Sequence, residues 1–366
     1  MTNNNPPKIA HFIETDIPGG AEQVLLDLCL HTQQNHPDLK PVVLTFGHQW
    51  TMERCQKLGI EHLTIPYLKL FKKSVFLPFF TIAFAYWLRK NNIRLLHSHL
   101  FGPITGSAPA CWLARIPHVG TLHDVYMIQE KPSRIKLIQL ANTLGTKLIA
   151  VSKNMQTFYQ QQAPLPQLPV IYNGIDTDAF RPMERKDHNE PITLSCTGRL
   201  IPLKQVDQII EATLRLLKKY NVKLVILGDG PERQKLERLA AEYPENILFE
   251  GQQNTVRDYL WRTDIFVQYS TTEGLSRSIA EAACCGLPCV VSDVGGNPEI
   301  VVHNQSGLLV PHNDIDALYQ GLEDLISNQE RRQQFSLQAR QHAIEQFDKD
   351  ACNESNIALY KKLLSS

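Results

Sequence analysis

The sequence lacks an excess of either charge, because 37 lysines and arginines balance 37 aspartates and glutamates among 366 residues. A general nucleic-acid binder needs a basic surface to neutralise phosphates, so this balance argues against one. The apolar share of 43% and the charged share of 20% are typical of folded globular proteins, which excludes a disordered chain and a multi-span membrane protein. The length favours two domains, since one core rarely grows beyond about 250–300 residues.

Other common signals are also missing. None of the eight cysteines forms a CxxC pair, and most lie in apolar stretches, which predicts reduced core residues in a cytosolic protein. The polar residues 1–7 lead directly into a short apolar segment, whereas a signal peptide needs a basic start and a longer apolar run. Neither a GxSxG elbow nor a GxxxxGK[ST] phosphate loop occurs. We therefore expect a cytoplasmic protein without either of these two catalytic signatures.

Short apolar runs alternate with longer helix-like stretches, which is typical of βα units around a parallel sheet. The candidate strands of the first half are residues 9–13, 41–46, 93–97, 118–123, 147–151 and 169–172. Those of the second half are residues 192–197, 222–227, 247–249, 265–269, 288–292 and 308–310. The pattern predicts an α/β protein with two Rossmann-like doubly wound domains facing across a cleft, because ligands of such sheets bind beyond the carboxyl ends of the strands.

The polar segment 181–191 contains a proline near each end and is expected to be a linker. It would separate a first domain of residues 1–180 from a second domain of residues 192–345. The end of the chain has a helical pattern without glycine or proline. We expect residues 346–366 to form a helix that packs back on the first domain.

Residues 75–88 (VFLPFFTIAFAYWL) form an uncharged stretch with basic residues on both sides. A helix that spans a bilayer needs about 20 apolar residues, so this one is too short to cross. Two interpretations stay open. The stretch is either a helix buried against the first sheet or a helix in the membrane interface, with aromatic residues dipping in and basic residues meeting anionic lipid.

The segment 270–288 carries the densest chemical signal. A strand is followed by a turn and by a helix expected over about 276–285, whose free backbone N–H groups at 275–278 predict a seat for a phosphate. Glu273 lies just before this helix and Glu281 in its second turn, so both can face one cleft. Because carboxylates accept paired hydrogen bonds from sugar hydroxyls, the arrangement favours a nucleotide-sugar site.

The Glu273-x7-Glu281 pair, followed by residues 286–288 (GLP) and 295–301 (GGNPEIV), resembles the retaining glycosyltransferases of family 4, which have the GT-B fold. The resemblance covers most of the chain, because further motifs occur in the family's order. These are residues 19–22 (GGAE), 97–99 (HSH), 121–124 (TLHD), 151–152 (VS), 172–176 (YNGID), 198–200 (GRL) with Lys204, and 228–231 (GDGP).

The resemblance implies a role for each matching residue. Arg199 and Lys204 would hold the donor pyrophosphate and offset the charge that develops on the leaving nucleotide. Glu281 would bind the ribose hydroxyls, and Glu273 would bind hydroxyls of the transferred sugar. His123 would lie near the reacting sugar, where its ring can donate to a hydroxyl.

The remaining donor-binding residues implied by the resemblance are Gly19, Gly20, Gly230, Gly274, Leu275 and Ser276. The glycine pair would let the backbone approach the phosphates closely. The chain departs from the family at Gln205, where glycine often follows the lysine, and at Leu275–Arg277, where Phe-Gly often follows the turn. Arg277 is interpreted either as a surface residue or as a contact to phosphate or sugar.

Two patterns in the sequence could be metal sites. His97-x-His99 on a strand would place both rings on one face, where zinc is conceivable, but no clear acidic partner set accompanies them. Asp176-x-Asp178 could hold a divalent metal against a diphosphate, but the pair matches the GT-B segment, where a turn is expected. We expect no metal and no cofactor.

The resemblance therefore implies a metal-independent, retaining hexosyltransferase. It would use an NDP-sugar, either a UDP- or a GDP-hexose, and a saccharide or lipid-linked acceptor in cell-surface polysaccharide, lipopolysaccharide or glycolipid synthesis. A peripheral contact of residues 69–94 with the inner face of an anionic membrane is also expected, and a nucleic-acid partner is not. Two alternatives remain: a nucleotide-sugar 2-epimerase of the same fold, and a non-catalytic sugar-binding or scaffold protein.

Overall fold

The computed structural model describes residues 6–15, 19–183, 191–253 and 255–365. The chain forms two compact units, the first made of Met1–Gly174 with Lys349–Ser366 and the second of Ile175–Asp348. The boundaries expected from the sequence, at residues 180 and 346, lie a few residues from these. Residues 184–190 of the expected linker lie outside the described residues.

The first unit is built on a six-stranded sheet in the order β3-β2-β1-β4-β5-β6. Its neighbouring strands pair in parallel, and most of their side chains are buried, which is typical of a sheet covered on both faces. The strands are β1 Lys8–Phe12, β2 Lys40–Thr45, β3 Glu61–Thr64, β4 Ile93–His99, β5 His118–Leu122 and β6 Lys147–Ala150.

One strand expected in this sheet is absent, and one strand that the sequence did not predict is present. Residues 169–172 form no strand, only a bridge between Ala150 and Val170, next to a proline that has no N–H to donate. The sixth strand is instead β3 at the sheet edge, with the sequence EHLT. One apolar residue among four gives no strand pattern, so the sequence did not indicate it.

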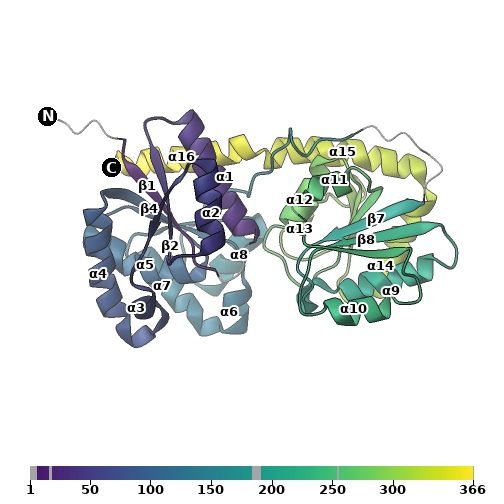
Figure 1. The fold of residues 1–366 in the computed structure, drawn as a ribbon, viewed down its shortest axis with the longest axis horizontal. Coiled ribbons are helices and arrows are strands. Elements are labelled where there is room, and N and C mark those ends of the chain that lie inside the picture. The colour runs from purple at the N-terminus through teal and green to yellow at the C-terminus, as the bar shows by residue number, and fades with distance from the viewer. Residues whose placement is uncertain (1–5, 16–18, 184–190, 254, 366) are drawn as a thin grey trace. The chain divides into compact units, whose positions relative to one another are not determined.

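Helices cover both faces of the first sheet (Figure 1). Alternate residues of β1 and the residue after it show this division. Ala10 and Phe12 pack against α4 and α5, whereas Ile9 and Ile13 pack on the side of α1, α2 and α16. The helices are α1 Gly20–Asn35, α2 Gln49–Leu58, α3 Leu68–Lys72, α4 Leu77–Lys90, α5 Phe101–Ala114, α6 Tyr126–Glu130, α7 Ile135–Thr143, α8 Lys153–Gln162 and α16 Lys349–Leu364, with short 3₁₀ turns η1 Ser74–Phe76 and η2 Pro132–Arg134.

Helix α4 contains most of the uncharged stretch 75–88. Phe80, Phe84 and Leu88 are fully buried against the sheet, so the buried-helix interpretation is right for one face. The opposite face leaves large apolar side chains in solvent: Phe79, Ile82 and Tyr86 are 64%, 64% and 66% exposed. In the part of the chain that the structure describes, no helix combines the length and the apolar character needed to span a bilayer.

The second unit contains another parallel six-stranded sheet, in the order β12-β11-β10-β7-β8-β9. All six strands expected in this half are present, with β7 and β10 at the centre. They are β7 Ile192–Thr197, β8 Val222–Leu227, β9 Ile247–Gly251, β10 Ile265–Gln268, β11 Cys289–Ser292 and β12 Gly307–Val310. The helices are α9 Val206–Leu216, α10 Arg233–Leu239, α11 Val256–Leu260, α12 Arg277–Cys284, α13 Asn297–Ile300, α14 Ile315–Ser327 and α15 Gln329–Phe347, with the 3₁₀ turn η3 Pro202–Lys204.

Candidate functional site

Two loops meet at the carboxyl edge of the second sheet. Strands β7 and β10 are parallel neighbours, so the loop after β7 and the loop after β10 leave the sheet side by side. The first loop contains Arg199 and ends in η3 at Lys204, and the second contains Glu273. A backbone hydrogen bond of 2.9 Å from Thr271 N to Leu203 O joins them. Residues about 70 positions apart in the chain thus come into contact.

The Glu273 carboxylate is the centre of this contact. Its Oε1 accepts hydrogen bonds from Lys204 Nζ at 2.5 Å, from Gln268 Nε2 at 2.6 Å and from Ser270 Oγ at 2.7 Å. The Glu273 side chain is 11% exposed and that of Lys204 is 24% exposed. Hydrogen bonds to an ionised group in such a partly desolvated place are stronger than neutral ones, so the carboxylate is held in one position.

Gln268 is a residue that the sequence analysis missed. It is the last residue of β10 and is 3% exposed. Besides its bond to Glu273, its amide bonds Ser276 Oγ at 2.8 Å and accepts from Ser278 Oγ at 2.6 Å. The only signal in the sequence is a polar residue at the end of the strand sequence IFVQ, and a polar residue there is as easily a strand end facing solvent.

Helix α12 begins where expected, with Ser276 as its N-cap residue. The Ser276 side chain does not cap the helix, because it is bonded to Gln268 instead. On the next turn, Arg277 Nε donates to Glu281 Oε1 at 2.8 Å, and the two side chains are only 18% and 12% exposed. Arg277 is thus partly exposed and paired with the carboxylate expected to bind ribose, and its contact with phosphate or sugar stays a prediction.

Two glycines allow the loops to pack this closely. Gly295 has a φ of +55°, and a Cβ there would lie 1.9 Å from Glu273 O, so only glycine lets the backbone pass beside the Glu273 turn. A Cβ at Gly230 would lie 2.4 Å from Leu200 O. Gly230 thus supports the loop that contains Arg199, whether or not it also touches a donor.

The other donor-binding residues expected in this unit surround the same edge. Arg199 is exposed, and together with Thr197, Gly198, Lys204 and Gln268 it lines a small hollow. Leu275 is buried, and Gly274 and Ser276 lie beside it in the turn before α12. The edge therefore presents two cations, two carboxylates and the start of a helix.

Gly19, Gly20 and His123 belong to the first unit. Gly20 is the first residue of α1, and Gly19 N donates to Glu22 Oε2 at 2.7 Å. Gly19 is extended, and a Cβ there would make only ordinary contacts, 3.6 Å from the nearest atom. Among the described residues of the unit, no contact therefore demands glycine at this exposed position.

His123 is half-buried and lies beside a buried group of histidines at the carboxyl edge of the first sheet. The parallel register places His11 beside His97, and His99 points to the same face two residues further on. His123 Nε2 lies 3.2 Å from His99 Nδ1, while His97 Nδ1 lies 2.5 Å from the Tyr360 hydroxyl of α16. Four imidazoles and a phenol are thus packed into one polar core.

Burial keeps these rings neutral. It lowers the pKa of His123 to about 4 and that of His11 to about 3, and it lowers the pKa values of His97 and His99 well below the usual range, with help from neighbouring imidazoles. A neutral His123 can donate one hydrogen bond, which agrees with the role that the resemblance implies for it. It is too weak a base to carry a proton at neutral pH.

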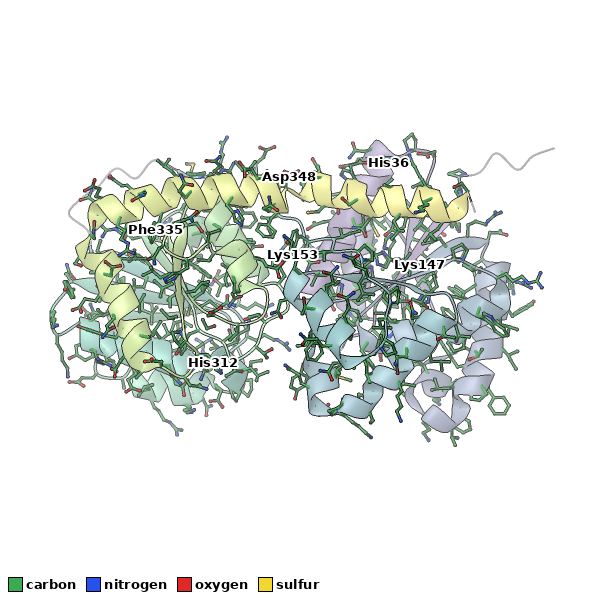
Figure 2. The ribbon with its side chains drawn as sticks, turned by 180° about the vertical axis from the view of Figure 1, so that it is seen from behind. His36, Lys147, Lys153, His312, Phe335 and Asp348 are labelled. Atoms are coloured by element: carbon green, nitrogen blue, oxygen red, sulfur yellow. The ribbon has the colours of Figure 1, made fainter. Side chains whose placement is uncertain are left out.

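The described residues contain two groups that could hold a metal. His11, His97 and His99 offer ring nitrogens within 4.8 Å of one another, but both nitrogens of His97 already bond Tyr360 and Thr121. In the other group, Glu354 of α16 bonds the imidazoles of both His31 and His36, and Figure 2 shows His36 beside that helix. In both groups a metal would have to displace hydrogen bonds that are already made.

Asp176 is used in a turn. Its Oδ1 accepts from Ala179 N at 2.8 Å, and its carbonyl accepts from Phe180 N at 2.9 Å. Neither Asp176 nor Asp178 belongs to a group of potential ligands among the described residues. The contacts thus agree with the interpretation of this pair as a turn.

Comparison with known proteins gives the same family throughout. The model of "Glycosyltransferase Family 4" matches residues 18–179, and that of "Glycosyl transferases group 1" matches residues 176–342. N-acetyl-alpha-D-glucosaminyl L-malate synthase of Bacillus anthracis is 26% identical over 71% of this chain and 72% of its own. UDP-Gal:alpha-D-GlcNAc-diphosphoundecaprenol alpha-1,3-galactosyltransferase of Escherichia coli is 28% identical over 64% of this chain and 67% of its own.

Solved structures show the same fold. HepE of Anabaena, crystallised in complex with UDP, superposes with a TM-score of 0.82 over 97% of this chain and 100% of its own, at 20% identity. HepE has also been crystallised with UDP-glucose. The two family matches together span residues 18–342, so the chain belongs to the group 1, family 4 glycosyltransferases, has their GT-B fold, and is a glycosyltransferase that uses a nucleotide-sugar donor.

Proposed function

We propose that this protein transfers a hexosyl group from an NDP-sugar with retention of configuration and without a metal ion. The observation that carries the proposal is the convergence of Lys204, Gln268 and Ser270 on the Glu273 carboxylate at the carboxyl edge of the second sheet. A cation and an acceptor group are held together there, which suits a ligand with a diphosphate next to a polyhydroxy ring.

Donor binding would rearrange this contact. Arg199 and Lys204 would take the pyrophosphate, so Lys204 would exchange one anionic partner for another. Glu273 would then be free to accept hydrogen bonds from hydroxyls of the transferred sugar. Glu281, oriented by Arg277, would accept from the ribose hydroxyls. Lys204, Glu273 and Glu281 each keep a charged or hydroxyl partner in both states, which limits the desolvation cost of the exchange.

The chemical step would proceed on one face of the sugar. The bond between the anomeric carbon and the phosphate oxygen breaks, and the acceptor oxygen attacks the same face. The acceptor proton passes to the departing phosphate oxygen, so no side chain has to act as a strong base. This agrees with the pKa of about 4 for His123, which would act as a hydrogen-bond donor. The protein would contribute positioning and charge stabilisation.

The acceptor is proposed to be a saccharide or a lipid-linked saccharide in cell-surface polysaccharide, lipopolysaccharide or glycolipid synthesis. The exposed apolar face of α4 supports a membrane-bound acceptor, because the flanks at residues 69–94 are rich in lysine and arginine. The relative from Escherichia coli acts on a diphosphoundecaprenol-linked sugar, and HepE binds UDP. We therefore propose a UDP-hexose as the first donor to test and the inner face of the membrane as the site of action.

The first test is a panel of UDP- and GDP-hexoses with and without candidate acceptors. We expect slow donor hydrolysis and, with the right acceptor, a glycoside of retained configuration detected by NMR. Conversion of donor alone into a C2 epimer would instead establish the epimerase alternative. Binding of donor without any turnover on the whole panel would favour the sugar-binding or scaffold alternative.

Metal independence has its own test. Because Arg199 and Lys204 would neutralise the pyrophosphate, activity in excess EDTA should equal activity in magnesium. Turnover that disappears in EDTA and returns with manganese would contradict the proposal. It would favour the interpretation of Asp176 and Asp178 as metal ligands.

A further inference from the structure

The amino-terminal edge of the first sheet contains a hollow of about 370 Å³, at the opposite end of the strands from His99 and His123. Its volume lies within the range of about 300–1,000 Å³ that is usual for small-molecule sites. The ends of α4, α5 and α16 and the starts of β4 and β5 enclose it. It is lined by Arg89, Asn92, Ile93, Arg94, Ala114, Arg115, Ile116, Pro117, Leu363 and Leu364.

Three arginines face this hollow, and none of its lining residues is acidic. Arg89 is fixed in place, because its Nε and Nη2 donate to Ala114 O at 3.1 and 2.9 Å. That bond also satisfies a carbonyl at the end of α5, which is the ordinary structural use of a cation there. Within the described part of the chain, the guanidinium groups of Arg94 and Arg115 form no ion pair or hydrogen bond. Their charge is therefore available to a ligand.

The rest of the lining is apolar, and so is the surface beside it. The hollow is lined by the apolar side chains of Ile93, Ile116, Leu363 and Leu364. On the last turn of α5, next to Arg115, Trp112 is 62% exposed. A ligand that suits both the arginines and the apolar lining has an anionic head and a hydrocarbon tail. A phosphate fits the head, since guanidinium groups bind phosphate in a planar, bidentate manner.

We propose that this hollow binds the phosphate of an anionic phospholipid headgroup, with Arg94 and Arg115 as its two ligands. The proposal deepens the membrane contact proposed above and rests on it: that contact needs only basic charge near a bilayer, whereas the hollow adds a shaped site. Arg89 keeps the two helix ends together around the site. The exposed ring of Trp112 would enter the membrane interface beside this site.

The experiment measures sedimentation of the full chain with phosphatidylcholine vesicles that contain or lack phosphatidic acid. A basic residue near an anionic surface is worth about 1 kcal/mol, or about fivefold, so Arg94→Gln with Arg115→Gln should weaken binding about 25-fold. Arg94→Lys with Arg115→Lys keeps the charge but loses the planar fork, and should still weaken binding at least fivefold. The control Lys57→Gln with Lys218→Gln removes the same charge from exposed positions elsewhere and should change binding less than twofold. Donor hydrolysis should be unchanged in all three variants.

The outcomes distinguish phosphate binding in the hollow from the wider membrane contact. If the lysine variant binds vesicles as wild type does, the attraction between the basic residues and the anionic lipid is diffuse. The phosphate site in the hollow is then refuted, while the membrane contact stands. If wild type ignores anionic vesicles at low salt, both are refuted, and donor hydrolysis then shows whether the enzymatic proposal survives. Calorimetry with glycerol 3-phosphate tests whether the ligand is a free phosphate ester instead of a lipid. The lipid assignment would be overturned if wild type bound glycerol 3-phosphate, the glutamine variant did not, and wild type showed no preference for anionic vesicles.

Discussion

At the scale of single residues, Glu273 and Glu281 have different partners and should hold different parts of the donor. Glu281 pairs with Arg277, whereas Glu273 is bonded by Lys204, Gln268 and Ser270. Glu281→Gln should weaken a free nucleoside diphosphate and the intact donor by a similar factor. A hydrogen bond to a charged group is worth about 1.5–3 kcal/mol, which corresponds to roughly 10- to 150-fold. Calorimetry with the nucleoside diphosphate measures this loss.

Glu273→Gln is the matched comparison. The bare nucleotide has no sugar for Glu273 to bind, and the substitution frees Lys204 from its ion pair, so nucleotide affinity should not fall. Transfer should fall by a similar 10- to 150-fold, because the sugar hydroxyls lose a charged acceptor. A nucleotide affinity that drops as far in Glu273→Gln as in Glu281→Gln would show that the two assignments are wrong.

Gln268 is predicted to act on the donor through Glu273. Gln268→Met keeps the shape and loses the bonds to Glu273, Ser276 and Ser278, so transfer should fall about tenfold or more. The matched double variant Gln268→Met with Glu273→Gln should be little worse than Glu273→Gln alone, because the two residues share one interaction. Transfer rates of the four proteins form the cycle. Fully additive losses would mean that Gln268 supports the fold rather than Glu273.

The sequence could supply some of these residues and not others. Lys204, Glu273 and Glu281 stand in motifs that resemble a family, so their types and order were enough to single them out. Gln268 and the pairing of Arg277 with Glu281 depend on side-chain directions at a strand end and on a helix turn. The contact between Lys204 and Glu273 depends on β7 and β10 being neighbours, which a single sequence does not give.

At the scale of elements, α4 has a buried face that the fold requires and an exposed apolar face that it does not. Phe79, Ile82 and Tyr86 can be replaced together by Gln with little effect on stability, since exposed substitutions usually change it by less than about 0.5 kcal/mol each. Vesicle binding should fall strongly. Even about 1 kcal/mol per side chain, below the about 1.5–3 kcal/mol of full burial, amounts to roughly 100-fold.

Thermal unfolding and vesicle sedimentation together check this expectation. Phe80→Gln is the control on the buried face, and it should lower the melting temperature because it places a polar group in the core. Unchanged sedimentation of the triple variant, in a protein that melts as wild type does, would show that this face does not meet the membrane.

The sequence pattern predicts some strands of the two sheets and misses others. In the second half, segments rich in apolar residues identify all six strands, including the edge strands β9 and β12. At the edge of the first sheet the pattern fails, since β3 has only Leu63 as an apolar residue and is half-exposed. Strand β3 thus lacks the apolar signal that identifies the edge strands β9 and β12.

At the scale of the whole molecule, the chain passes between its two units twice, near Gly174 and near Asp348. Helix α16, from the end of the sequence, completes the first unit, where Ile357 and Tyr360 are buried with residues of β1, β4, β5 and β6. The two units nevertheless differ in one respect that matters for stability. The first contains several buried histidines, and in the second no described histidine is buried.

Acid should therefore unfold the first unit before the second. Burial lowers the pKa of His11 and His118 to about 3 and that of His123 to about 4, against 6.5 for an unperturbed histidine. Between these values the unfolded chain binds protons that the folded unit excludes, so the free energy of unfolding falls as the pH drops below about 6.5, and the loss is complete near pH 3–4. At pH 5 each such histidine costs about 2 kcal/mol. Hydrogen exchange at pH 7 and pH 5 should show protection lost in β1, β4 and β5 and kept in β7 and β10. Equal loss in both sheets would mean that carboxylate protonation, and not the histidine core, controls acid unfolding.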